Sequence, residues 1–223
     1  MVDALRLSGD EVRRIYDRRS RHYARTVGRL ERRAHLRALE LARISPDDKV
    51  LEVAVGPGTT LVEILAKVDG ANVVHGVDIS SGMLRQAART AAAAGYQNFE
   101  LRQADARQLP YPDQSFDLVY NGYMLDLMSL GDIRAVLAEF HRVLRPGGRL
   151  VLVHMSKRDP ERITWFERIY EALPERLVPR VLGLCRPVAV EPYVRQAGFV
   201  AVRREFVGGL MPSEIITAHR SSP

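Results

Sequence analysis

Three acidic residues in the first half of the chain, Glu52, Asp78 and Asp105, each lie in or directly after a short apolar run. Runs of this kind, rich in β-branched residues, are typical of strands buried on both faces of a parallel sheet. Because the carboxyl ends of parallel strands meet at one edge of the sheet, the three carboxylates are expected to lie together. Carboxylates at that edge can accept hydrogen bonds from ribose hydroxyls and from an exocyclic amine, so the spacing predicts a nucleoside site.

The turn after the first run indicates which ligand fits. Gly56-Pro57-Gly58 continues into Thr59-Thr60-Leu61, which has neither the third glycine of a dinucleotide fingerprint nor the Gly-Lys-Ser/Thr of a P-loop. The carboxylate of Glu52 near the turn repels a pyrophosphate and favours a ligand that carries a cation. A ligand with a ribose, a cation near the turn and no phosphate is S-adenosylmethionine.

Two segments carry a resemblance to a known family. Glu52-Val53-Ala54-Val55-Gly56-Pro57-Gly58 resembles the first motif, acidic-x-Gly-x-Gly-x-Gly, of the class I S-adenosylmethionine-dependent methyltransferases, with Ala54 in place of the first glycine. The segment from Leu109 to Asp117 resembles the family's Leu-Pro-Phe-x-Asp-x-Ser-Phe-Asp. Over nearly the whole chain the sequence is similar to the C-methyltransferases of ubiquinone and menaquinone biosynthesis and to the phospholipid N-methyltransferases.

The resemblance implies which residues hold the cofactor S-adenosylmethionine. The turn provides an acidic residue and backbone that a ligand can approach closely. Asp78 accepts hydrogen bonds from the ribose hydroxyls, and the residues after Asp78 lie on the adenine face. Asp105 and its neighbour meet the adenine amine and ring, and Asn121 faces the reactive end. The expected cofactor residues are Glu52, Ala54, Gly56, Gly58, Asp78, Ile79, Met83, Asp105, Ala106 and Asn121, and no metal site is expected.

Two residues are candidates for catalysis. His154 is expected at the end of the fifth strand, at the same sheet edge as Asn121, where a histidine can serve as a general base. The alternative is a strand-end histidine that a neighbour satisfies. Tyr23 ends a segment, Tyr16 to Tyr23, that resembles the Tyr-Asp-x-x-Ala-x-x-Tyr segment covering the methionine end in the quinone and phospholipid groups.

These residues need a doubly wound α/β fold to position them. The resemblance implies a seven-stranded sheet that is mostly parallel, with the last strand antiparallel and an N-terminal helical lid. The expected strands are 49–53, 72–78, 99–104, 118–120, 150–153, 199–207 and 214–219. The expected helices are a pair in 10–44, one that starts at 59, then 79–94, 132–144, a short pair in 159–187, and 190–197.

A chain of 223 residues with 46% apolar content can form one core, so 1–223 is expected to be a single methyltransferase domain. Its expected parts are the lid (1–45), the cofactor-binding core (46–156), a helical substrate cover (157–189) and a C-terminal helix and strand pair (190–223).

The net charge of +6 comes almost entirely from arginine, much of it in the first forty residues. Nucleic acid is disfavoured as a partner, because Asn121-Gly122-Tyr123-Met124 lacks the Pro-Pro-aromatic sequence of nucleic-acid amino methyltransferases. A solvated basic face and a peripheral contact with an anionic membrane are both retained as alternatives. The single cysteine and the charged N-terminus predict a cytoplasmic protein, and the oligomeric state is left open.

Three functions are compatible with these patterns. The leading one is methyl transfer to a small apolar acceptor, such as a quinone-type molecule. The second is N-methylation of a phospholipid headgroup of the phosphatidylethanolamine type, for which the arginine-rich lid is equally suitable. The third, of a different class, is a non-catalytic module that binds an S-adenosyl ligand. In the first two cases the acceptor is a small molecule or a lipid.

Overall fold

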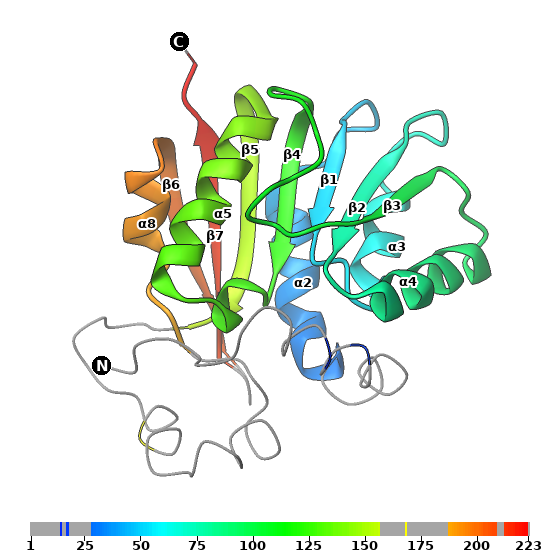
Figure 1. The fold of residues 1–223 in the computed structure, drawn as a ribbon, viewed down its shortest axis with the longest axis horizontal. Coiled ribbons are helices and arrows are strands. Elements are labelled where there is room, and N and C mark those ends of the chain that lie inside the picture. The colour runs from blue at the N-terminus through cyan, green and yellow to red at the C-terminus, as the bar shows by residue number, and fades with distance from the viewer. Residues whose placement is uncertain are drawn as a thin grey trace.

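A computed structural model describes residues 14, 17, 28–156, 168, 187–208 and 212–222. These residues form one seven-stranded sheet with helices on both faces (Figure 1). Tyr23, most of the expected lid and nearly all of the expected substrate cover lie outside the described residues. Within the described part of the chain, no helix is long and apolar enough to cross a membrane.

The strand order is β3-β2-β1-β4-β5-β7-β6. The strands are β1 (Val50–Val53), β2 (Val74–Asp78), β3 (Phe99–Gln103), β4 (Phe116–Gly122), β5 (Leu144–Met155), β6 (Phe199–Val207) and β7 (Ser213–Arg220). The first five strands pair in parallel, whereas β7 is antiparallel to both β5 and β6. The predicted seven-stranded mixed sheet with an antiparallel last strand is therefore confirmed.

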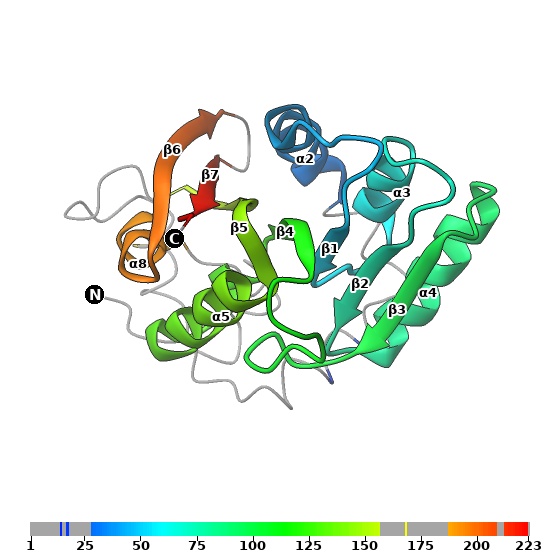
Figure 2. The ribbon, with the colours of Figure 1, turned by 90° about the horizontal axis from the view of Figure 1, so that it is seen from above.

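The sheet separates two helical layers (Figure 2). On one face lie α2 (Gly28–Ala42), α3 (Thr59–Leu65) and α4 (Ser81–Ala93); on the other lie α5 (Leu130–Val143) and α8 (Glu191–Gln196). A short 3₁₀ helix, η1 (Leu125–Leu127), follows β4. All four residues of β1 are buried because both faces of that strand are covered.

Two helix starts follow directly from local sequence. Ser80 caps α4 by accepting from the Met83 amide, and Ser129 caps α5 by accepting from the Asp132 amide. Serine is favoured at this position because its hydroxyl satisfies one of the free amides of the first turn. The Ser80 cap also fixes where the chain leaves β2, directly beside Asp78.

Two strands are longer than expected, and this changes the place of two site residues. β4 runs through Gly122, so that Asn121 lies inside the strand, paired with Val53 of β1, and not at its tip. β5 begins at Leu144, paired with Phe116, and continues to Met155, so that it includes the expected turn at Gly147-Gly148. Its end is extended because β7 pairs with it as far as Met155.

Candidate functional site

A cavity of about 490 Å³ opens at the carboxyl ends of β1, β2 and β4, between α2 and the loop after β3. From β1 the chain continues to β2 and β3 on one side and then crosses to β4 on the other side of β1, so the cavity lies where the strand order reverses. Ligands of doubly wound folds bind at this reversal. Glu52, Asp78 and Asp105 all line the cavity, which places the three acids together as their spacing predicts.

The turn after β1 contains three residues in the left-handed region, Ala54 (φ 59°), Gly56 (φ 56°) and Gly58 (φ 83°). At Gly56 a Cβ atom would meet nothing within 4 Å, so this backbone is open to a ligand in the cavity. At Gly58 a Cβ atom would lie 2.6 Å from the Cα of Ala87. Gly58 therefore permits close packing of α3 on α4 and does not itself line the cavity.

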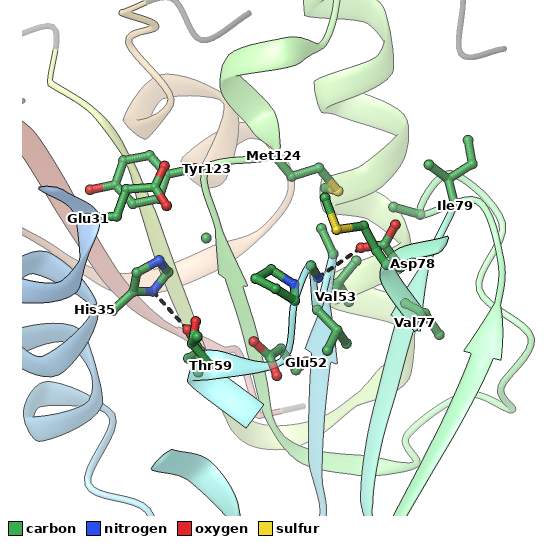
Figure 3. A pocket seen from close by; sticks show the side chains of 18 of the residues that line it. Glu31, His35, Glu52, Val53, Thr59, Val77, Asp78, Ile79, Tyr123 and Met124 are labelled. Carbon is green, nitrogen blue, oxygen red and sulfur yellow. Dashed lines mark hydrogen bonds between the residues drawn. The ribbon is translucent and has the colours of Figure 1, made fainter. Parts of the chain in front are cut away.

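The Asp78 carboxylate is held by the turn after β1 and by the start of α4. One carboxylate oxygen accepts from the Gly56 amide at 2.9 Å and the other accepts from the Ser80 amide at 2.8 Å (Figure 3). Burial raises the pKa of Asp78 to about 6, although the backbone amides oppose this shift. Above that pH the group is a charged acceptor at the end of β2, in reach of a ribose.

Glu52 is 3% exposed and lies at the base of the turn (Figure 3). Its Oε2 atom has no hydrogen-bond partner among the described residues. Burial, and then the charge of Asp78, raise the pKa of Glu52 well above its ordinary value. Because a buried carboxyl group without partners is costly, this site favours a ligand that donates hydrogen bonds or carries positive charge.

The part of the cavity that is expected to hold adenine contains some of the predicted residues. Ile79, Met83 and Ala106 line it, and Met83 is 1% exposed. The carboxylate of Asp105 is engaged by the Arg107 guanidinium at 2.6 Å, and this bond lowers the pKa of Asp105. Asp105 therefore stays ionised as an acceptor, but it shares its oxygens with Arg107.

Besides Gly58, two further predicted site residues do not line the cavity. Asn121 is 1% exposed, and its side-chain amide donates to the Val53 carbonyl at 2.9 Å, so it joins β4 to β1. His154 is fully buried inside β5 opposite Glu214, and its Nδ1 lies 3.0 Å from the Met155 carbonyl oxygen. Burial lowers the pKa of His154. The expectation that His154 is a base at the cavity is wrong, because β5 continues past it; Tyr23 stays a prediction outside the described residues.

Residues of α2 and of the end of β4 complete the site, and the two from α2, Glu31 and His35, were not expected from the sequence. Glu31, His35, Tyr123 and Met124 line the cavity; Glu31, His35 and Tyr123 lie across the β1 turn from Asp78, whereas Met124 lies nearer to Asp78 (Figure 3). Glu31 and His35 are four residues apart and share one face of α2. That spacing could have indicated that both residues face the site. The arginines between and around them, however, made the helix resemble an ordinary helix with a charged face.

Comparisons with known proteins agree with this geometry. A family model described as a methyltransferase domain matches residues 50–148. A demethylmenaquinone methyltransferase of Geobacillus stearothermophilus is 32% identical over 152 residues, which are 66% of this chain and 64% of that protein. The aligned part is thus less than two thirds of the relative's length.

Solved structures show the same fold at low identity. The [4+2]-cyclase SpnF superposes with a TM-score of 0.79 at 18% identity, covering 99% of both chains. The N-methyltransferase NodS of Bradyrhizobium japonicum, bound to S-adenosyl-L-homocysteine, superposes with a TM-score of 0.65 at 15% identity, covering 86% of this chain and 87% of that one. Residues 50–148 thus match a methyltransferase domain, and the chain has the fold of S-adenosylmethionine-dependent methyltransferases.

Proposed function

We propose that the protein transfers the methyl group of S-adenosylmethionine to a small, largely apolar acceptor of the quinone type. The observation that carries the proposal is the carboxyl group of Glu52, buried beside the open backbone of Gly56 and without a partner for Oε2 among the described residues. A pyrophosphate would be repelled by the ionised form of this group, whereas a ligand with an ammonium and a sulfonium would stabilise that ionised form.

The described residues fit this cofactor. Asp78 would hold the ribose, Ile79 and Met83 the adenine face, and Glu52 with Gly56 the methionine end. When bound, the cofactor supplies an electrophilic methyl group on a positively charged sulfur. The protein's contribution is to hold the acceptor in line with that methyl group and to exclude water, and such alignment can lower a barrier by up to about 7–11 kcal/mol in the best intramolecular cases.

The acceptor side of the cavity supports a ring-shaped apolar molecule. Leu36, Leu39, Tyr123 and Met124 line the cavity together with Asp78 and supply apolar and aromatic surface for such a ring. Relatives named demethylmenaquinone methyltransferases point to the same class of acceptor. Since SpnF shares the fold but is described as a cyclase, the fold alone does not determine the reaction.

A phospholipid headgroup is the second candidate, because the Arg32 side chain lines the cavity, is 67% exposed, and lies 3.9 Å from Glu63 in an ion pair among the described residues. Such an arginine can bind the phosphate of a lipid at the mouth of the cavity. Lipid methylation also requires a contact between the protein and a membrane surface, which would make the protein peripheral there.

A release assay separates these functions from a non-catalytic module. S-adenosylmethionine binding is measured by calorimetry, and S-adenosylhomocysteine formation is then measured with quinols, phenols and phosphatidylethanolamine vesicles. Turnover with quinols and none with vesicles supports the leading proposal. Turnover with vesicles alone supports the lipid acceptor, and binding with no turnover on any panel supports the module.

A further inference from the structure

His35 is fixed in one orientation on the acceptor side of the cavity. Its Nδ1 lies 2.6 Å from the Tyr120 hydroxyl and 3.4 Å from Thr60 Oγ1. The ring packs directly on the backbone of β4, because a Cβ atom at Gly122 would lie 2.4 Å from His35 Cε1. The edge of the ring also meets Tyr123, with ring centroids 5.3 Å apart.

This arrangement leaves the second ring nitrogen for a ligand. Nε2 has no hydrogen-bond partner among the described residues, and His35 lines the cavity. Burial lowers the pKa of His35 to about 4, so the ring is neutral at physiological pH. When Nδ1 donates its proton to the Tyr120 oxygen, Nε2 has a lone pair free to accept a proton.

The position of His35 relative to the cofactor residues decides which ligand it meets. His35 and Tyr123 lie on one side of the β1 turn, and Asp78 and Ile79 lie on the other (Figure 3). If the adenosyl part occupies the side of Asp78, the ligand beside His35 is the acceptor. Resting on the proposed function, we propose that His35 binds the hydroxyl group of a phenol- or quinol-type acceptor and takes its proton during methyl transfer.

The proposed methyl transfer conserves atoms and charge. Nε2 removes the hydroxyl proton, and the electron pair of the oxygen, delivered directly or through the conjugated ring carbon, forms the bond to the methyl carbon. The bond between that carbon and sulfur breaks, and its electrons stay on sulfur as a neutral thioether. After attack by carbon, the ring proton is lost to water as the ring becomes aromatic and its oxygen regains a proton. The imidazolium is neutral again at the end, so each turnover releases one proton.

The timing of proton transfer follows from charge. Burial keeps His35 neutral before the reaction, and a sulfonium beside it would disfavour the imidazolium further. The same sulfonium favours ionisation of the acceptor, and its charge disappears as the methyl group moves. Proton transfer and methyl transfer are therefore expected to occur together, with Tyr120 as the positioning residue that keeps Nε2 directed at the acceptor.

The test compares His35→Gln with the wild type on a series of phenols and quinols of decreasing pKa. Glutamine can accept a hydrogen bond but cannot take a proton. For acceptors that are protonated at the assay pH, kcat/KM should fall by about 100-fold or more. For nitro-substituted phenols that are already ionised, the loss should shrink to a few-fold, and the activity of the variant should rise with pH as the phenolate forms.

A matched control keeps the result interpretable. His219 is exposed and lies opposite Arg149 in the register of β5 and β7, away from the carboxyl end of β5. His219→Gln should therefore behave as the wild type. S-adenosylhomocysteine affinity should be unchanged in both variants, which excludes misfolding. Tyr120→Phe should lower kcat, with a smaller effect on KM, and should keep the dependence on acceptor pKa.

One outcome overturns the proposal while leaving the proposed function intact, namely an equal loss of activity in His35→Gln for every acceptor, whatever its pKa. Wild-type turnover on vesicle amines but on no phenol or quinol would overturn both this proposal and the quinone-type acceptor. Absence of S-adenosylmethionine binding in the wild type would instead refute the proposed function itself.

Discussion

At the scale of single residues, the site depends on two carboxyl groups whose surroundings differ. Asp78 accepts from two backbone amides and titrates within reach of physiological pH, whereas Glu52 lacks a partner for Oε2 among the described residues and favours its protonated form. A cationic ligand would stabilise the ionised form of both. Ligand binding and proton release are therefore expected to be coupled.

Removal of the Asp78 carboxylate should weaken cofactor binding. Asp78→Ala loses the charge-assisted hydrogen bonds to the ribose, and the affinity for S-adenosylmethionine should fall by about 1–3 kcal/mol. Calorimetry measures the change. Asp47→Ala, an exposed acid before β1, is the control and should bind as the wild type; an unaltered affinity in Asp78→Ala would show that the ribose does not lie at this residue.

The same carboxyl group predicts a pH dependence. The pKa of Asp78 in the free protein is about 6, and bonds from ribose hydroxyls should lower it in the complex. The free protein thus holds more protons near pH 6 than the complex does, so binding should strengthen as pH rises through 6. Affinities measured from pH 5 to 8 should change by up to about tenfold per unit at the acidic end, and Asp78→Asn should flatten that profile. A profile equally steep in the variant would assign the dependence to another group.

The same substitution should impair mainly cofactor binding at Gly56 and mainly folding stability at Gly58. At Gly56 a methyl group enters the open cavity, so Gly56→Ala should impair binding more than folding, and Gly56→Val should abolish binding while leaving the fold largely intact. At Gly58 a methyl group meets the backbone of α4, so Gly58→Ala should destabilise the fold by about 2 kcal/mol or more. Urea unfolding and calorimetry on both variants check this, and equal loss of stability at the two positions would contradict it.

At the scale of elements, a partly buried ion pair joins the edge strand β6 to its antiparallel neighbour β7. The Arg204 guanidinium donates to the Glu214 carboxylate, whose side chain is 1% exposed. Glu214 lies opposite His154 on β5, so charge is brought into the interior where β7 joins the parallel part of the sheet. Such a pair is costly to break, because the remaining charge is left buried.

Arg204→Ala should therefore lower the free energy of unfolding by about 3 kcal/mol. Arg203→Ala, on the exposed side of the same strand, is the matched control and should change stability by less than about 0.5 kcal/mol. Adding Glu214→Gln to Arg204→Ala should restore part of the loss, because the uncompensated charge is removed. Urea denaturation curves provide the measurement; equal stabilities of the two arginine variants would contradict the ion pair's role.

Local sequence predicted the elements well but not their ends. The apolar runs were readable because they depend on neighbouring residues, and the structure confirms the sheet they predict. The lengths of β4 and β5 depend on pairing with β1 and β7, which are distant in sequence, and this moved Asn121 and His154 away from the cavity. Likewise, only the packing of Ala87 against Gly58 separates the roles of the two glycines in the turn.

At the scale of the whole molecule, many arginines of the described part join segments that are distant in sequence. Arg37 pairs with Glu205 and links α2 to β6, and Arg149 donates to the Ala42 carbonyl oxygen and to Asp48, linking β5 to the loop before β1. The positive charge of these residues is thus partly used inside the fold. Arg32, at the mouth of the cavity, remains the cation best placed for an external anion.

The cavity is expected to bind an adenosyl sulfonium and not a phosphorylated dinucleotide. Calorimetric titration of the wild type with S-adenosylmethionine and, in parallel, with NAD⁺ tests this expectation most directly. The geometry of Glu52, Gly56 and Asp78 predicts one-to-one binding of S-adenosylmethionine and no heat with NAD⁺. Binding of NAD⁺, or no binding of S-adenosylmethionine at saturating concentration, would contradict the account.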